Sequence, residues 1–217
     1  MSNTTTKIED HICKRLALIA PFGHFTQELA TQVANRNKAK VTDLSFKTLD
    51  SAMRKCLSRK CDVSELRDLA RTTIVCDFNA ISKVVKDLVD TLKHNGCFGR
   101  YVQQEYETRG YWGVIVNPVF LVNGQMVMTE IQITSYEMFY ASHSTEFCTS
   151  CLGENLYKSI RNAVGIEGGK GHLLYEISRD ESGLYTNEQK KKAEKENYNY
   201  YNNFRGNYKF GETKFLN

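Results

Sequence analysis

Met-Thr-Glu-Ile-Gln-Ile-Thr, at positions 128–134, has the alternation of a β-strand and decides how this chain folds. Side chains alternate between the two faces of a strand, so Ile131 and Ile133 can enter a core. Glu130 and Gln132 then project together from the other face. A carboxylate placed there is suited to binding a metal or moving a proton, although a half-buried strand with a solvated outer face has the same pattern.

A hairpin leads into this strand. Residues 111–121 are rich in β-branched and apolar side chains, and Asn123-Gly124 is a strong signal for a two-residue turn into a strand at 127–134. Residues 71–76 predict a further strand, which ends at Asp77. The order of helices and strands therefore predicts an α+β fold in which a mixed or antiparallel sheet is flanked by helices.

Apolar residues at helical spacing predict those helices. The clearest helix covers residues 81–92 and stops near Asn95-Gly96. A helical segment at 7–38 should break near Pro21-Phe22-Gly23, because proline removes a backbone donor. Further helices are expected at 46–58, as a short lead at 63–69, and from residue 136 to a Gly-rich break at 165–171, with helix resuming at 172–179.

The bulk properties fit one well-cored domain with a peripheral extension, at 217 residues and 24.9 kDa. No apolar run approaches the roughly 20 residues of a membrane span, and the N-terminus lacks the apolar segment of a secretory signal. We expect a cytoplasmic protein without a membrane partner, with export by a signal-less route left open. The seven cysteines, an odd number scattered along the chain, predict reduced thiols.

The C-terminal part is basic and aromatic. From Thr186 onward seven Lys or Arg stand against four Glu, so this part carries +3 of the net +4, and seven aromatic residues are interleaved with the charge. Basic groups with aromatics suit a single-stranded nucleic acid or a tRNA end. A solvated helix followed by an Asn/Tyr-rich tail that makes an assembly contact is the alternative.

Three further groups could carry chemistry. Lys47, Ser51 and Lys55 are four residues apart and would line one face of a helix, where they could hold a polyphosphate or simply face solvent. Asp77, between a strand and a helix, could be a metal ligand or the N-cap of that helix. Gly110-Tyr111-Trp112-Gly113 places an aromatic beside two glycines, which allows a base to stack on the ring or the ring to pack inward.

In this order and spacing, four segments resemble motifs of the synthetase domain of RelA/SpoT homologues, the alarmone (p)ppGpp synthetases, and particularly its short single-domain members. Residues 47–55 resemble the ATP-side helix of that family, and 68–77 resemble its strand that ends in a magnesium-binding aspartate. Residues 109–114 resemble the loop whose tyrosine stacks on the acceptor base, and 130–134 resemble its strand with Glu and Gln two apart. The resemblance covers roughly residues 43–142.

Three positions depart from the family pattern. Ser45 stands where the family has an arginine that grips ATP, Thr73 replaces another arginine, and Ile115 replaces a histidine. Fewer cations near a triphosphate weaken the stabilisation of transition-state charge. Either the acceptor differs from GDP or GTP, or activity is lost, or other basic residues substitute, the candidates being Arg54, Arg71, Arg100 and Arg109.

The resemblance implies a nucleotidyltransferase-like synthetase fold over residues 41–182, between an N-terminal helical segment at 1–40 and the tail at 183–217. It implies a Mg²⁺-dependent pyrophosphokinase, synthetic only, that transfers the β,γ-diphosphate of ATP to the 3′-hydroxyl of a GDP/GTP-like acceptor and releases AMP. Two alternatives stay open: a toxin or effector of the same fold acting on adenine nucleotides or the tRNA 3′ end, and a degenerate module that binds nucleotide without turnover. Short members of the family assemble as tetramers, which leaves a homo-oligomer open as well.

The resemblance also implies roles for particular residues. Asp77 and Glu130 would hold the metal, Glu130 would also accept the hydroxyl proton, and Gln132 would orient Glu130 or the acceptor. The remaining residues fall into two sets. The ATP-binding set is Lys47, Ser51, Arg54, Lys55 and Arg71, and the acceptor-binding set is Arg109, Gly110 and Tyr111.

Overall fold

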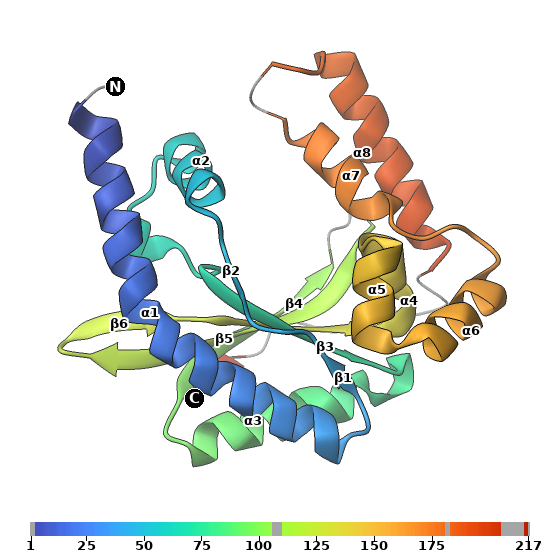
Figure 1. Ribbon diagram of the computed structural model, residues 1–217, viewed down its shortest axis with the longest axis horizontal. Coiled ribbons are helices and arrows are strands. Elements are labelled where there is room, and N and C mark those ends of the chain that lie inside the picture. Colours follow the sequence, from blue (N-terminus) through green and yellow to red (C-terminus); the bar gives the residue numbers. More distant parts are fainter. Residues whose placement is uncertain (1–2, 106–109, 181–182, 205–214, 217) are drawn as a thin grey trace.

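A mixed β-sheet forms the centre of the computed structural model, which describes residues 3–105, 110–180, 183–204 and 215–216 (Figure 1). The strand order is β1-β3-β7-β5-β4-β8, with β2 paired to β3 and β6 paired to β5. β3 and β7 run parallel, whereas the other paired strands run antiparallel. The strands are β1 (Lys40–Val41), β2 (Ser45–Phe46), β3 (Ala70–Cys76), β4 (Phe98–Glu105), β5 (Trp112–Val122), β6 (Gln125–Met128), β7 (Glu130–Ser135) and β8 (Phe215–Leu216).

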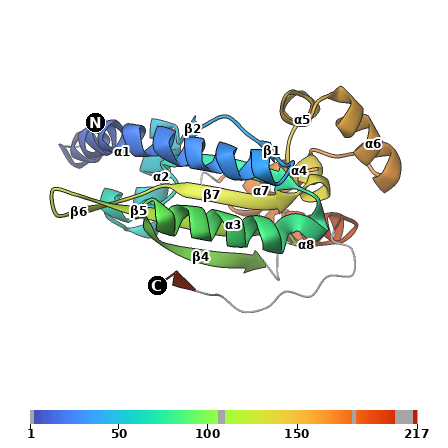
Figure 2. The same ribbon diagram turned by 90° about the horizontal axis from the view of Figure 1, so that it is seen from below.

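One face of the sheet packs against α1 (Asn3–Arg36) and α3 (Ile81–His94), which lie side by side along the strands (Figure 2). Ile131 and Ile133 of β7 point to this face and are 0% exposed, as the alternation in the sequence predicts. The helix predicted for 81–92 is confirmed. Its buried residues are those expected from the spacing: Ile81, Val84, Leu88 and Leu92.

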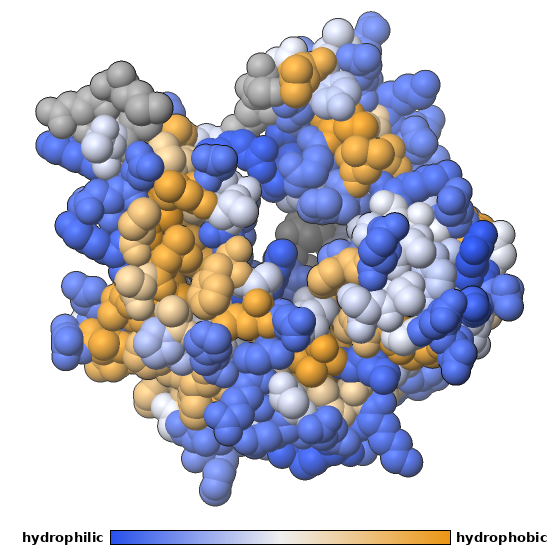
Figure 3. All heavy atoms as spheres, in the orientation of Figure 1, coloured by the Kyte–Doolittle hydropathy of each residue, from blue (hydrophilic) through white to orange (hydrophobic). Residues whose placement is uncertain are grey.

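The other face of the sheet is flanked by two helical walls (Figure 1). One wall is α2 (Leu49–Arg59), and the other is α7 (Lys170–Ser178) with α8 (Asn187–Asn202). The space-filling view shows a hollow between these walls (Figure 3). The chain reaches the second wall through α4 (Tyr136–Ser142), α5 (Thr145–Leu152) and α6 (Glu154–Val164), and it forms short 3₁₀ turns at η1 (Val63–Glu65) and η2 (Phe78–Ala80).

The break predicted near Pro21 in the first helix is wrong, because α1 continues through the proline. A proline inside a helix costs about 3 kcal/mol. Several apolar side chains of α1 are buried, and each contributes about 1.5–3 kcal/mol, which outweighs that cost. Those that are 2% exposed or less include Ile12, Ile19, Leu29 and Val33.

The hairpin at Asn123-Gly124 is confirmed, since both residues have positive φ and β6 pairs with β5 across the turn. The single strand predicted at 127–134 is instead divided into β6 and β7 around Thr129. Opposite this position is Pro118, which has no N–H for the ladder. The side-chain amide of Asn117 donates to the Thr129 carbonyl instead, at 3.1 Å.

β4 is a strand that the hydrophobic pattern does not predict. Residues 98–105 carry mainly polar side chains, with no apolar alternation. The strand pairs antiparallel with β5 along its whole length, from Phe98 opposite Val119 to Glu105 opposite Trp112. Backbone hydrogen bonding to a long neighbour therefore defines β4.

The described part of the basic C-terminal segment is folded against the domain. Tyr200, Tyr201 and Phe204 are 9%, 3% and 6% exposed, and they belong to the main core. The Tyr201 hydroxyl lies 3.1 Å from the Ser142 hydroxyl, and the Tyr200 hydroxyl donates to the Glu167 carbonyl at 3.0 Å. These three rings are therefore not available to stack on bases, which contradicts that part of the nucleic-acid hypothesis.

Among the described residues, none of the helices combines the length and the apolar character that crossing a bilayer requires. All seven cysteines are free thiols, as their number and scatter predict.

Candidate active site

A carboxylate held between two lysines lies at the start of β3. Lys55 Nζ is 2.8 Å from Asp68 Oδ1, and Lys47 Nζ is 3.1 Å from Asp68 Oδ2. Burial acts to raise the pKa of Asp68, but the two ammonium groups outweigh it and lower the pKa to about 2. Asp68 is therefore ionised at neutral pH and holds both lysines in place.

The predicted lysine pair thus converges, although not along one helix. α2 begins after its N-cap Thr48, whose hydroxyl accepts from the Ser51 N–H, so Lys47 lies just outside the helix. Ser51 lies one turn before Lys55 and is half-buried. The two ammonium groups meet at Asp68 because the chain enters α2 beside the start of β3, where Lys47 N–H donates to the Leu69 carbonyl at 2.9 Å.

Glu130 begins β7 and is the buried acid of this site, at 8% exposure. Gln132 Nε2 donates to its Oε1 at 2.8 Å, so the pair that the sequence places on one face is in contact. Burial raises the pKa of Glu130, while Arg71 and the Gln132 hydrogen bond oppose the rise. The charge of Asp68 also raises the pKa of Glu130. The two carboxyl groups are therefore electrostatic neighbours.

The predicted meeting of Asp77 and Glu130 is wrong. In the parallel ladder Glu130 is opposite Arg71, and Ser135 is opposite Cys76. Asp77 thus lies six residues beyond the partner of Glu130, about 20 Å along the strand at roughly 3.3 Å per residue. Its side chain caps η2 by accepting from the Asn79 N–H at 2.8 Å. Asp77 has the capping role that its position also allowed.

Asp68 is the acid that sequence reasoning missed. Parallel strands begin at the same edge of a sheet, so Asp68, two residues before β3, lies near the first residue of β7. The motif at 68–77 has an aspartate at each end, and choosing between them requires knowing that β3 and β7 are parallel. The parallel pairing of β3 and β7 is the feature that identifies Asp68, since the motif itself does not distinguish its two aspartates.

The chemistry of this pair fits a magnesium ion. Mg²⁺ keeps several waters and binds proteins through one or two carboxylates together with substrate phosphates. Asp68 and Glu130 supply two carboxylates beside two lysines. Within the described residues there is no group of three or more His, Cys, Asp or Glu side chains that could hold a metal without a substrate. The residues present therefore suit a metal that arrives with a nucleotide.

The three positions that depart from the family pattern all lie on this face. Ser45 is opposite Arg71, which is in turn opposite Glu130. Thr73 and Ile115 are the two register partners of Gln132, one on each side. Ser45 thus has an arginine beside it. Thr73 and Ile115 instead leave Gln132 between a hydroxyl and an aliphatic side chain.

Arg54 reaches from α2 to the opposite wall of the hollow, where its Nη2 lies 3.7 Å from Glu176 Oε2 of α7. It does not contact the Asp68 group in the described structure. Two histidines near the sheet were also missed by sequence reasoning. Burial lowers the pKa values of His143, to about 4, and of His172, and Arg71 adds to both effects.

The predicted acceptor loop lies against α8. Gly110 has φ +72°, and a Cβ there would lie 2.8 Å from the Tyr198 carbonyl oxygen, so only glycine fits. The Tyr111 ring meets the Tyr201 ring edge-on, with centroids 5.5 Å apart. Arg109 lies outside the described residues, as does the side chain of Arg100.

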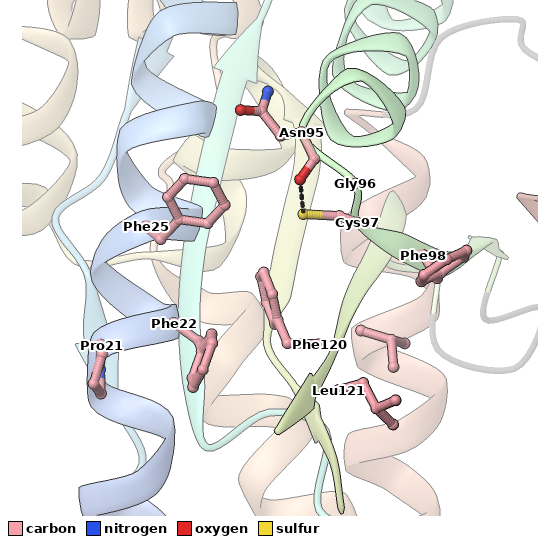
Figure 4. Close-up of a pocket in the computed structure, with 10 residues that line it drawn as sticks. Pro21, Phe22, Phe25, Asn95, Gly96, Cys97, Phe98, Phe120 and Leu121 are labelled. Carbon is pink, nitrogen blue, oxygen red and sulfur yellow. Dashed lines mark hydrogen bonds between the residues drawn. The ribbon is translucent and has the colours of Figure 1, made fainter. Parts of the chain in front are cut away.

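A second concavity lies on the opposite side of the sheet. This groove of about 400 Å³ is formed by α1, β5 and the turn after α3 (Figure 4). Phe22 and Phe25 face Phe120 across it, and the Cys97 thiol donates to the Asn95 carbonyl. The groove is apolar and separate from the face that carries Glu130.

No protein-family model matches this sequence. The (p)ppApp synthetase toxin Tas1 of Pseudomonas aeruginosa (strain UCBPP-PA14) is 28% identical over 151 residues, which are 68% of this chain and 32% of the toxin. The chain thus spans about a third of the length of that relative. In the crystal structure of the complex between the type VI effector Tas1 and its immunity protein, the matched chain has a TM-score of 0.62 and 24% identity, covering 94% of this chain and 98% of that one.

A more distant likeness is small alarmone synthetase 1 from Bacillus subtilis bound to its product pppGpp. It has a TM-score of 0.46 and 16% identity, over 68% of this chain and 91% of that one. The fold predicted from the motifs is confirmed by Tas1: the chain has the alarmone synthetase fold, and the relative that it resembles in sequence is a (p)ppApp synthetase toxin.

Proposed function

We propose that this chain is a Mg²⁺-dependent pyrophosphokinase that transfers the β,γ-diphosphate of ATP to the 3′-hydroxyl of an acceptor nucleotide and releases AMP. The observation that carries the proposal is the meeting of two carboxyl groups and two lysines at the start of β3 and β7, formed by Asp68, Glu130, Lys47 and Lys55. The 28% identity with a (p)ppApp synthetase toxin supports the same reaction class.

Glu130 acts as the general base in this proposal. The acceptor 3′-oxygen attacks the β-phosphorus of ATP, the bond between that phosphorus and the oxygen bridging to the α-phosphate breaks, and AMP leaves with the bond electrons. The proton of the hydroxyl passes to the Glu130 carboxylate. A buried glutamate with a raised pKa is a better base than an exposed one, and Gln132 orients it through the 2.8 Å hydrogen bond.

The cations of the site hold the donor. Lys47 and Lys55 exchange part of their interaction with Asp68 for phosphate oxygens of ATP. Arg71 adds charge near the start of β3, opposite Ser45, where the arginine of the family pattern is absent. Asp68 and Glu130 would hold Mg²⁺, which would supply positive charge to offset the negative charge that develops on the phosphates. Ser51 lies on the same side of α2 one turn from Lys55 and lines the donor site.

An adenine nucleotide is the acceptor that the comparisons favour. The relative Tas1 is named as a (p)ppApp synthetase, and the residues beside Gln132 differ from those of the GDP/GTP-using pattern at Thr73 and Ile115. Tyr111 would stack on the acceptor base. A tRNA acceptor has less support, because three of the tail rings that could have bound single-stranded RNA, Tyr200, Tyr201 and Phe204, are buried. As a toxin, the chain would act in the cytoplasm, where ATP and its acceptor are present, and would be paired with a protein inhibitor.

Anion-exchange chromatography of reaction mixtures tests this proposal. The purified chain is incubated with ATP, Mg²⁺ and, in separate reactions, AMP, ADP, GDP, GTP or tRNA. The proposal predicts AMP release coupled to a new product with two additional phosphates. Asp68→Asn should slow product formation roughly 10²-fold or more, while Lys158→Ala, on an exposed ion pair of α6, should not. ATP consumption without such a product, or equal activity in Asp68→Asn, would contradict the proposal.

A further inference from the structure

Three basic side chains converge on one carboxylate at the wall opposite Asp68. Arg179 Nη2 lies 2.5 Å from Glu176 Oε1, and His172 Nε2 lies 3.9 Å from the same atom. Arg54 approaches the other oxygen from α2. The group therefore joins both walls of the hollow and includes none of the residues assigned to the metal or the base.

A role in stability does not explain this convergence. The side chains of Arg54 and His172 are 57% and 68% exposed, and that of Glu176 is 31% exposed. Exposed ion pairs contribute little to folding, because solvent screens them and the long side chains lose freedom. The same exposure means that another anion can replace Glu176 at small cost to the fold.

The position of the group relates it to the acceptor. Tyr111, the predicted stacking residue, contacts Tyr201, and the Tyr201 hydroxyl lies directly against Gly171 in the first turn of α7. From Gly171 to Arg179 the helix rises about 12 Å. His172, Glu176 and Arg179 are spaced i, i+4 and i+7, so they share one face of the helix. A nucleotide whose base stacks on Tyr111 and whose phosphates follow α7 toward its C-terminal end would reach this face.

The surroundings prepare these groups for phosphate. The Arg179 guanidinium lies over the Tyr175 ring, 4.6 Å from its centroid, and its Nη1 donates to the Tyr175 hydroxyl at 3.3 Å. These contacts fix the planar group, which can then donate two hydrogen bonds to one phosphate. The His172 imidazole, 3.9 Å from the Glu176 carboxylate, supplies a further nitrogen that can donate a hydrogen bond to an anion.

We propose that Arg179 and His172 of α7, together with Arg54 of α2, bind the 5′-phosphates of the acceptor nucleotide, and that the Glu176 carboxylate occupies this position until a phosphate displaces it. The identity of the ligand as an acceptor rests on the proposed function. The group supplies cations that Ser45, Thr73 and Ile115 do not. It selects acceptors that carry at least two 5′-phosphates.

Titration calorimetry with AMP, ADP, GMP and GDP tests the site without requiring turnover. Arg179→Ala should weaken binding of the nucleoside diphosphate of the preferred base by about tenfold or more. Binding of the monophosphate should change much less. Glu176→Gln should tighten binding of the diphosphate, because it removes the carboxylate charge that competes with the phosphates. Lys158→Ala, a matched loss of an exposed ion pair elsewhere, should change neither. If Arg179→Ala fails to fold, Arg54→Ala replaces it: Arg54→Ala should weaken binding of the diphosphate, and Glu176→Gln should tighten it.

Steady-state kinetics separates this inference from the proposed function. With saturating ATP, Arg179→Ala should raise KM for the diphosphate acceptor and leave KM for ATP unchanged. An increase confined to KM for ATP, or equal effects on mono- and diphosphates, would overturn the acceptor site while leaving the pyrophosphokinase intact. Wild-type protein that binds the diphosphate in the expected way but forms no product would instead overturn the proposed reaction. Absence of any nucleotide binding would overturn both.

Discussion

Arg71 of β3 lies directly opposite Glu130 of β7 in the parallel ladder, so a guanidinium-bearing side chain and a buried carboxyl share one face of the sheet. Burial raises the pKa of Glu130, and the positive charge of Arg71 is the largest influence that opposes the rise. Arg71 therefore keeps the acid close to the range in which it can accept a proton.

Replacing this arginine should move the pH dependence of the reaction. In Arg71→Met the pKa of Glu130 rises further, so the protonated, inactive form persists to higher pH. The acid limb of the kcat profile should shift to higher pH, while Lys158→Ala leaves it in place. Rates measured in overlapping buffers at constant ionic strength check this. An acid limb that does not move would show that Glu130 is not the group that titrates.

The two aspartates at the ends of the 68–77 motif should behave differently. Asp68→Asn removes a carboxylate beside the base and should lower kcat roughly 10²-fold or more. Asp77→Ala removes the cap of η2 and should lower the free energy of unfolding by about 0.5–2 kcal/mol, with activity per folded molecule retained. Product assays and urea unfolding of both variants measure these effects. The reverse pattern of activity would restore the magnesium role to Asp77.

Tyr111 should act through its ring and not its hydroxyl. Tyr111→Phe keeps the stacking surface, whereas Tyr111→Ala removes a contact worth about 1–3 kcal/mol per base, or roughly 5- to 150-fold in acceptor KM. Gly113→Ala tests the placement of the Tyr111 ring independently. The added Cβ would lie 3.5 Å from the Tyr111 hydroxyl and 3.2 Å from the Ile133 carbonyl oxygen. The KM for ATP should stay constant in all three. A large loss in Tyr111→Phe would point to the hydroxyl instead.

Stability should fall when the protein is acidified from neutral pH. Burial lowers the pKa of His143 from 6.5 to about 4, with help from the charges of His172 and Arg71. Between these two values the unfolded chain binds a proton that the folded chain does not, so the free energy of unfolding decreases as pH falls, by up to roughly 3 kcal/mol. His143→Gln should flatten this part of the curve. Parallel curves for parent and variant, from urea unfolding at pH 7 and pH 5, would contradict the assignment.

Local pattern predicted the elements whose side chains alternate or repeat clearly. The two isoleucines of β7, the apolar side of α3 and the Asn123-Gly124 turn are where the sequence places them. The pattern did not predict β4, because the pairing of this strand rests on backbone hydrogen bonds. It wrongly predicted a break at Pro21, because burial of apolar side chains along α1 outweighs the cost of the proline.

The site was predictable only in part for the same reason. Glu130 and Gln132 are two residues apart on one strand, so their contact follows from local geometry. Asp68 lies near Glu130 through the parallel pairing of distant strands, and Arg54 reaches Glu176 through helices on opposite walls. Long-range pairing of this kind is not visible in residue spacing, which explains the choice of Asp77 from the motif alone.

A crystal structure with Mn²⁺ and a non-hydrolysable ATP analogue tests the central claim most directly. Mn²⁺ gives an anomalous signal and takes the oxygen ligands of Mg²⁺. The account predicts an anomalous peak within coordination distance of a carboxylate oxygen of Asp68 and one of Glu130, with Lys47 and Lys55 on the triphosphate. A peak at Asp77, or a triphosphate bound without contact to the start of β3, would contradict it.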